Sequence, residues 1–169
     1  MRKEYRENSW LGQIRKMNRK FDSRVGKMPG LLYELKQKPP LTRSELVGIP
    51  IMGVYVFYKE ENPIYVGRSN RLKERIQEHG RPSAGHNSAP FAFNVALEEI
   101  RRIRQIPKDL TRAELARKSY FKEPFKKAKA RVANMRIRVI KIEDQVEQAL
   151  FEIYASLALN TKYNDFGTH

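Results

Sequence analysis

The sequence of 169 residues contains no cysteine, only three histidines and no long apolar run. The lack of cysteine excludes a disulfide framework, a thiolate nucleophile and zinc or iron–sulfur sites ligated by cysteine. With three histidines, a metal site built mainly from imidazoles is not expected. The lack of a long apolar run excludes a membrane-spanning helix, and the charged first residues do not resemble a signal peptide. We therefore expect a soluble, cytoplasmic protein.

Positive charge is in large excess, with 34 Lys and Arg against 19 Asp and Glu. Residues 1–50 carry a net charge of +7 and residues 101–140 carry +11. In contrast, residues 51–100 are neutral and residues 141–169 carry −3. Such an excess is typical of a protein whose partner is a polyanion, namely DNA, RNA or an acidic membrane surface.

Three segments rich in β-branched and aromatic residues predict strands. They span residues 53–58, 63–67 and 135–142. Together with the helical patterns around them, they predict an α+β fold with a small three-stranded, mainly antiparallel sheet flanked by helices. We assign residues 1–50 to a basic helical N-terminal arm and residues 51–169 to one domain. A basic helical insertion at about 82–134 interrupts that domain.

Helical spacing of apolar residues predicts helices on both sides of the strands. In the arm, Ile14, Met17 and Phe21 share one face, which predicts an amphipathic helix docked on another surface. Pro124 is expected in the first turn of a helix. The last helix is predicted to pack through an apolar stripe formed by Val146, Leu150, Ile153 and Leu157.

Polar residues that can carry chemistry recur at regular intervals in the hairpin and the helix after it. Tyr55 and Tyr65 lie ten residues apart on the two strands, and Arg75 follows ten residues later. His79 comes four residues after Arg75, on the same face of the helix. The last helix and the segment beyond it add Glu152 and Asn164.

These residue types match the needs of phosphodiester hydrolysis. A carboxylate such as Glu152 can hold one hard divalent cation that keeps several of its waters. The guanidinium of Arg75 presents paired donors for phosphate oxygens. The phenol of Tyr55 is a weak base without help, whereas His79 titrates closest to neutrality. The residues alone leave open whether Tyr55 or His79 is the general base.

Two parts of the chain are similar to one known family. Residues 53–79 contain Gly-Val-Tyr, then Tyr-Val-Gly-Arg-Ser-Asn-Arg-Leu-Lys-Glu-Arg, then a histidine, and this run resembles the GIY-YIG nuclease module. Roughly residues 135–165 contain two glutamates and a Tyr-Asn pair spaced as in the nuclease module of the bacterial excision-repair incision subunit. The resemblance does not extend to residues 1–50 or 82–134.

The resemblance implies a divalent-metal-dependent endonuclease that acts on DNA with one Mg²⁺ or Mn²⁺ ion. It implies that Glu152 holds the metal, that Arg75 stabilises the phosphate and that Asn164 binds near the phosphate. It further implies that Tyr55 handles the water as base or relay with help from His79.

By the same resemblance Tyr65 orients the water or the phosphate. The predicted contacts to the nucleic-acid backbone are Arg68, Lys126, Lys127, Lys129 and Arg131. Such contacts fix position and salt dependence without reading sequence. DNA is the expected partner, and nothing in the residues excludes RNA. Double-strand cleavage with one metal site per chain would favour a homodimer or sequential nicks.

Two other interpretations compete with this one. A non-catalytic nucleic-acid-binding protein could retain the fold for its charge. A second nuclease site could be formed by Asp22, Glu34 and Lys36, whose pattern follows the restriction-type Asp…Glu-x-Lys core. Those residues lie in a region with helical spacing and have no predicted strand to present them, so this site is the weaker hypothesis.

Overall fold

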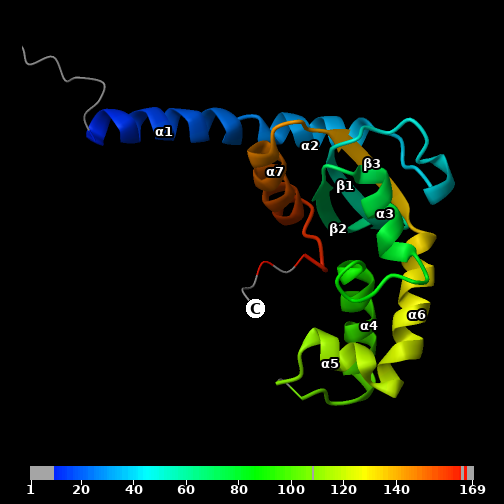
Figure 1. Ribbon diagram of the computed structural model, residues 1–169. Coiled ribbons are helices and arrows are strands. Elements are labelled where there is room, and N and C mark those ends of the chain that lie inside the picture. Colours follow the sequence, from blue (N-terminus) through cyan, green and yellow to red (C-terminus); the bar gives the residue numbers. More distant parts are fainter. Residues whose placement is uncertain (1–9, 108, 165, 167–169) are drawn as a thin grey trace, which may run out of the picture.

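The computed structural model describes residues 10–107, 109–164 and 166 (Figure 1). The first nine residues of the predicted arm lie outside this range. The elements in chain order are α1 (Trp10–Val25), α2 (Met28–Gln37), the 3₁₀ helix η1 (Arg43–Glu45), β1 (Gly53–Lys59), β2 (Asn62–Ser69), α3 (Leu72–Gly80), α4 (Pro90–Ile103), α5 (Arg112–Arg117), α6 (Ser119–Ala133), β3 (Arg136–Lys141) and α7 (Gln145–Ala158). The predicted α+β class is confirmed.

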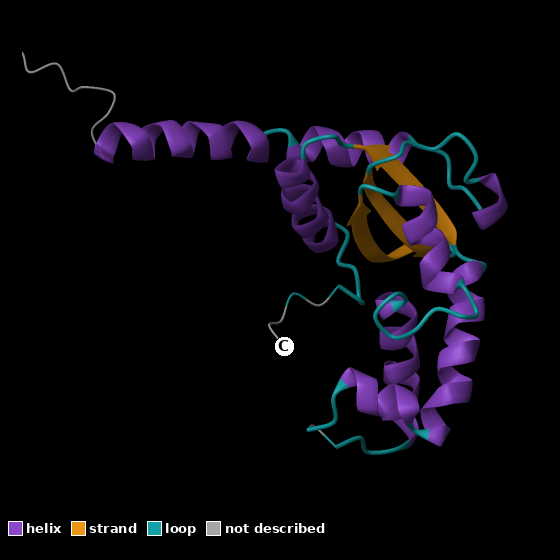
Figure 2. Cartoon of the chain, in the orientation of Figure 1, coloured by secondary structure: helices purple, strands orange, loops and turns teal. Residues whose placement is uncertain are grey.

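The three strands form one antiparallel sheet in the order β2-β1-β3 (Figure 2). β1 and β2 make the predicted hairpin, and β3 returns after the helical insertion to pair with the other edge of β1. Successive side chains of a strand point to opposite faces. Tyr55 and Phe57 therefore enter one core, whereas Val54, Val56 and Tyr58 enter the other.

Helices cover both faces of the sheet. Residues of α3, α4 and α6, among them Ile76, Phe91 and Phe121, pack on the face of Tyr55. Met28 of α2 and Phe151 of α7 pack on the opposite face. α2 thus belongs to the body of the molecule, whereas α1 projects from it as an arm (Figure 1). Among the described residues, no helix combines the length and apolar character needed to cross a bilayer.

The prediction for Pro124 is wrong. Helix α6 begins at Ser119, so Pro124 lies inside the helix and not in its first turn. Phe121 and Phe125 lie one turn apart and are both buried against Phe93 of α4. This aromatic contact extends the helix upstream of the proline, whose missing N–H costs one backbone hydrogen bond.

The predicted buried faces of α1 and α7 are also wrong. In α7 the buried residues are Gln148, Phe151, Ala155 and Ser156, whereas Val146, Ile153 and Leu157 are exposed. In α1, Met17 and Phe21 are exposed. The reason in α7 is that both sides of the helix are apolar, so helical spacing alone does not identify the side that faces the sheet.

Candidate active site

A buried hydrogen bond joins the hairpin to α3. The Oη of Tyr55, from β1, lies 2.7 Å from Nε2 of His79, in the last turn of α3. The two residues are only 1% and 0% exposed. Gly67 faces Tyr55 in the strand register, and a Cβ there would lie 2.4 Å from both Cζ and Oη of Tyr55. The Gly in the Tyr-Val-Gly run therefore makes room for the tyrosine ring.

The environment keeps His79 neutral near pH 7. Burial and, secondarily, the positive charge of Arg75 lower the pKa of His79 to about 3. Its Nδ1 atom has no hydrogen-bond partner among the described residues, so Tyr55 is the polar contact that orients the ring. A neutral imidazole donates from one nitrogen and accepts at the other.

Both tyrosines are protonated at neutral pH. Burial raises the pKa of Tyr55 well above its ordinary value, and burial together with Glu152 raises the pKa of Tyr65 to about 12. The charge of Arg75 opposes both shifts, which places its guanidinium near both phenols. The Tyr65 ring stacks on Phe91 of α4 with centroids 4.6 Å apart.

The guanidinium of Arg75 is positioned by α3 and by the loop that opens the insertion. Its Nη1 donates to Oε2 of Glu78 at 3.1 Å and to the backbone carbonyl of Ser88 at 2.9 Å. The helix supplies the first contact because the two residues lie three apart on one face. The loop supplies the second contact, so the insertion helps to hold the arginine.

Glu152 faces the same cluster from α7. Its carboxylate is partly exposed and lies 3.0 Å from Nε of Arg68, at the end of β2. Burial raises the pKa of Glu152, while Arg68 and Arg75 oppose the shift. Arg68, predicted to contact nucleic acid, is therefore paired with the predicted metal ligand in this structure.

Asn164 acts as a backbone clamp. Its Oδ1 accepts from the N–H of Val66 and its Nδ2 donates to the carbonyl of Val66, each at 2.8 Å. The N–H of Tyr163 donates to the carbonyl of Ile64 at 3.0 Å. The amide of Asn164 thus pairs with the exposed edge of β2 as a neighbouring strand would. The predicted contact of Asn164 with phosphate stays a prediction.

Five of the predicted site residues thus lie together between the β1–β2 hairpin, α3 and α7. They are Tyr55, Tyr65, Arg75, His79 and Glu152. A family model of the GIY-YIG catalytic domain matches residues 51–164. The chain belongs to the GIY-YIG family. Searches of curated proteins and of solved structures gave no match. GIY-YIG proteins are nucleases, which generally use a divalent metal, so this chain has a nuclease fold and its expected substrate is a nucleic acid.

The carboxylate of Glu152 suits the kind of metal that GIY-YIG nucleases use. Among the described residues, no three His, Asp or Glu side chains form a closed metal cage. Mg²⁺, however, is commonly held by one or two carboxylates, with waters and substrate phosphates completing its shell. A single, partly exposed carboxylate beside the two tyrosines and Arg75 fits such an ion.

The four basic residues of the insertion that were predicted to contact nucleic acid differ in their surroundings. Lys126 and Lys127 are exposed on α6. Lys129 is buried, and its Nζ donates to the carbonyls of Pro82 and Ala84, so its ammonium anchors the 81–89 loop and does not face a ligand. Arg131 is paired with Glu99 of α4. Lys129 is therefore corrected from a phosphate contact to a structural residue.

The restriction-type hypothesis gains no support from the geometry. Asp22 lies on the projecting helix α1, and Glu34 and Lys36 lie on α2. The carboxylate of Glu34 is paired with Lys38 at 2.9 Å. Helices present all three residues, whereas that site needs a strand to bring them together.

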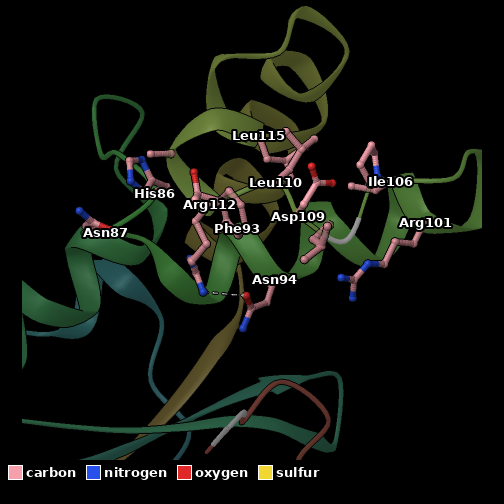
Figure 3. A pocket seen from close by; sticks show the side chains of 14 residues that line it. His86, Asn87, Phe93, Asn94, Arg101, Ile106, Asp109, Leu110, Arg112 and Leu115 are labelled. Carbon is pink, nitrogen blue, oxygen red and sulfur yellow. Dashed lines mark hydrogen bonds between the residues drawn. The ribbon is translucent and has the colours of Figure 1, made fainter. Parts of the chain in front are cut away.

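Sequence reasoning missed Arg112, which the insertion brings close to the GIY-YIG cluster. Its charge acts to lower the pKa of Tyr65, and its guanidinium lies 4.4 Å from the centroid of Phe93. Arg112 also lines a cavity of about 660 Å³ between α4, α5 and the loops beside them (Figure 3). No motif marks this residue, because its position depends on contacts of its guanidinium with Asn94 and with the carbonyl of Pro90 on α4.

Proposed function

We propose that this GIY-YIG protein is a divalent-metal-dependent endonuclease that hydrolyses DNA phosphodiester bonds. The observation that carries the proposal is the hydrogen bond between Tyr55 and His79, which lies within reach of the charges of Arg75 and Glu152. A neutral imidazole, a protonated phenol, a guanidinium and a carboxylate in one cluster supply the groups that phosphodiester hydrolysis needs.

In this proposal Tyr55 binds the attacking water and His79 accepts the phenolic proton of Tyr55. The Oη of Tyr55 donates to Nε2 of His79, which leaves an oxygen lone pair to accept from the water. As the water attacks, its proton passes to Oη and the phenolic proton passes to Nε2. Nε2 of His79 is already occupied by the Oη of Tyr55, so we assign His79 to the relay.

Arg75 links phosphate binding to this proton transfer. Its charge is one of the two causes that lower the pKa of His79. A phosphate bound to the guanidinium would neutralise that charge and so raise the pKa of His79 when substrate is present. Nη1 is held by Glu78 and Ser88, and the planar guanidinium has further N–H donors for phosphate oxygens.

Glu152 would hold a Mg²⁺ or Mn²⁺ ion. Such an ion supplies Lewis-acid stabilisation of the charge that develops on the phosphate and the leaving oxygen. If the ion took the place of Arg68 beside Glu152, Arg68 would be released to contact the DNA backbone. Asn164 and Tyr163 serve the reaction indirectly, because they fix the segment after α7 against β2.

Binding of the DNA backbone is proposed for the basic helices outside the catalytic cluster. Lys126 and Lys127 are exposed on α6, and Arg131 lies on the same helix. DNA is the proposed substrate, with RNA as the alternative polymer. One catalytic cluster per chain and two strands per duplex favour a homodimer for double-strand cleavage.

One observation favours a second function, that of a non-catalytic nucleic-acid-binding protein. Tyr55 and His79 are almost fully buried, and Glu152 is paired with Arg68. A protein whose site stayed closed in this way on DNA would bind the DNA without cutting it.

Incubation of the purified chain with supercoiled, linear, branched and single-stranded DNA and with RNA separates these functions. We expect nicking of DNA in Mg²⁺ or Mn²⁺ that EDTA abolishes. Binding in a gel-shift assay without cleavage in either metal would instead support the non-catalytic function. Cleavage confined to RNA would make RNA the substrate and would leave the assignment of the site unchanged.

A further inference from the structure

The 3₁₀ helix η1 holds the last turn of α3, although η1 precedes the residues that the family model matches, 51–164. Arg43, in η1, donates from Nη2 to the carbonyl of Gln77 at 2.8 Å and from Nη1 to the carbonyl of Gly80 at 3.3 Å. The last carbonyls of a helix have no partner within the helix. The guanidinium of Arg43 supplies a partner for two of them, and its positive charge is favourable at a helix C-terminus.

The two carbonyls bracket the part of α3 that serves the catalytic cluster. Between them lies Glu78, whose carboxylate accepts from Nη1 of Arg75 at 3.1 Å. Between them also lies His79, whose Nε2 is 2.7 Å from the Oη of Tyr55. Among the described residues, Nδ1 of His79 has no hydrogen-bond partner, so Tyr55 is its one polar contact. A shift of the last turn of α3 would therefore move the imidazole away from the phenol.

The segment that carries Arg43 is itself fixed to the body of the molecule. Leu41 pairs with Ile137 of β3 through two backbone hydrogen bonds, at 2.7 and 2.8 Å. Leu46 is buried in the same core cluster as Tyr55. Arg43 thus reaches α3 from a segment that is tied to the edge of the sheet, so its guanidinium can hold the helix end in place.

Contact with DNA is the alternative role for a basic residue in this region. Arg15 and Arg19 are exposed on α1 and suit that role. The guanidinium of Arg43 is partly buried, and this burial lowers its pKa from the ordinary value. Two of its nitrogens already donate to backbone carbonyls. These contacts favour a structural role for Arg43 over a contact with a phosphate.

We propose that Arg43 is a positioning residue, which holds the last turn of α3 so that the imidazole of His79 stays within hydrogen-bond range of Tyr55. Part of the region before residue 51 then belongs to the catalytic unit. The inference rests on the proposed function, because that function assigns the proton relay to Tyr55 and His79.

A double-mutant cycle on stability tests the proposal without DNA or metal. Arg43→Met removes both contacts with α3, and Tyr55→Phe removes the phenolic oxygen. We expect Tyr55→Phe to destabilise the Arg43→Met chain less than the natural chain, because the hydrogen bond is already weakened there. Arg136→Met is the matched control, because Arg136 donates to the carbonyl of Pro40 and not to a carbonyl of α3. Its effect should add to that of Tyr55→Phe, whereas additive effects for Arg43→Met overturn the proposal.

Single-turnover cleavage separates this role from a contact with DNA. We expect Arg43→Met to lower the rate at saturating DNA by about 10- to 100-fold, because a misplacement of about 1 Å at a reacting group can cost about 100-fold. DNA affinity should stay within a few-fold of the natural value. Arg136→Met should cleave at the natural rate. A weaker affinity with an unchanged saturated rate in Arg43→Met would make Arg43 a DNA contact and overturn the proposal.

Arg43→Lys provides a second variant, which also serves the cycle if Arg43→Met does not fold. Lysine keeps the charge but has a single side-chain nitrogen, whereas two nitrogens of Arg43 hold the two carbonyls. We therefore expect the same coupling with Tyr55→Phe at a smaller size, together with a smaller loss of cleavage rate. Coupling in a chain that cut no nucleic acid would support the positioning role and count only against the proposed nuclease activity.

Discussion

Substitution of Gly67 by alanine tests the packing at the centre of the site. A Cβ at position 67 would lie 2.4 Å from Cζ and Oη of Tyr55 and 2.9 Å from its Cε2, whereas ordinary contacts are about 3.4–4 Å. The ring would have to move by about 1 Å. Tyr55 is buried and contacts Phe57 and Tyr65, so the shift meets a filled core.

The cost has two parts. Overpacking of a core costs about 1–3 kcal/mol. The movement would also disturb the 2.7 Å hydrogen bond with His79, and an unpaired buried polar group costs about 1–3 kcal/mol. We expect Gly67→Ala to lower the free energy of unfolding by about 2–6 kcal/mol, which for a chain of this size is about 4–24 °C in Tm.

Thermal and urea unfolding measure this change, with Gly30→Ala as control. Gly30 lies in α2, and nothing lies within 4 Å of a Cβ built there, so alanine should stabilise by about 0.5–1 kcal/mol. Below its Tm, Gly67→Ala should also cleave DNA far more slowly, because Tyr55 is displaced. Unchanged stability and unchanged cleavage in Gly67→Ala would refute the packing account.

Two further predictions concern charge. Because the pKa of His79 in the folded protein is about 3, below its ordinary value of 6.5, its stabilisation is fully present above pH 6.5 and is lost as the pH falls toward 3. Between pH 6.5 and 4.5 the loss is about 2 kcal/mol. The free energy of unfolding, measured by denaturation at several pH values, should depend less steeply on pH in His79→Gln than in the natural protein, whereas His86→Gln should leave that dependence unchanged. An unchanged pH dependence in His79→Gln would contradict the buried neutral imidazole. The Lys126→Ala/Lys127→Ala pair should weaken DNA binding and lower the salt slope by up to about two, with single-turnover cleavage at saturating DNA retained. Salt-dependent fluorescence anisotropy measures that slope, and Lys59→Ala at the end of β1 is the control. A collapse of saturated cleavage would place the two lysines in the chemical step.

The sequence predicts the sheet well because strand patterning is local. The hairpin around Tyr55 and Tyr65 follows from β-branched and aromatic residues with a short polar turn between them. The sequence spacing also predicts that Tyr55, Arg75 and His79 lie in one cluster. Their positions depend only on one helix turn and one strand pairing, which are local features.

The errors arise where a residue's role depends on a distant partner. Spacing does not show which apolar side of α7 faces the sheet. The predicted stripe includes Ile153, which is exposed, and omits Phe151, which is buried. Lys129 has the same local sequence character as Lys127, yet the carbonyls of a loop more than forty residues away hold its ammonium. Asn164 finds its partner 98 residues away at the edge of β2, a contact that no local pattern encodes.

Single-turnover cleavage of plasmid DNA by Glu152→Gln tests the central claim most directly. Glu152→Gln keeps the size of the side chain but removes the charge that would hold the metal. Glu143→Gln, at an exposed carboxylate paired with Lys141, is the matched control. We expect the cleavage rate in Mg²⁺ or Mn²⁺ to fall by at least about 100-fold in Glu152→Gln, a loss of about 3 kcal/mol in transition-state stabilisation, with DNA affinity within a few-fold of the natural protein. Cleavage at the natural rate in Glu152→Gln would contradict the assignment of this site.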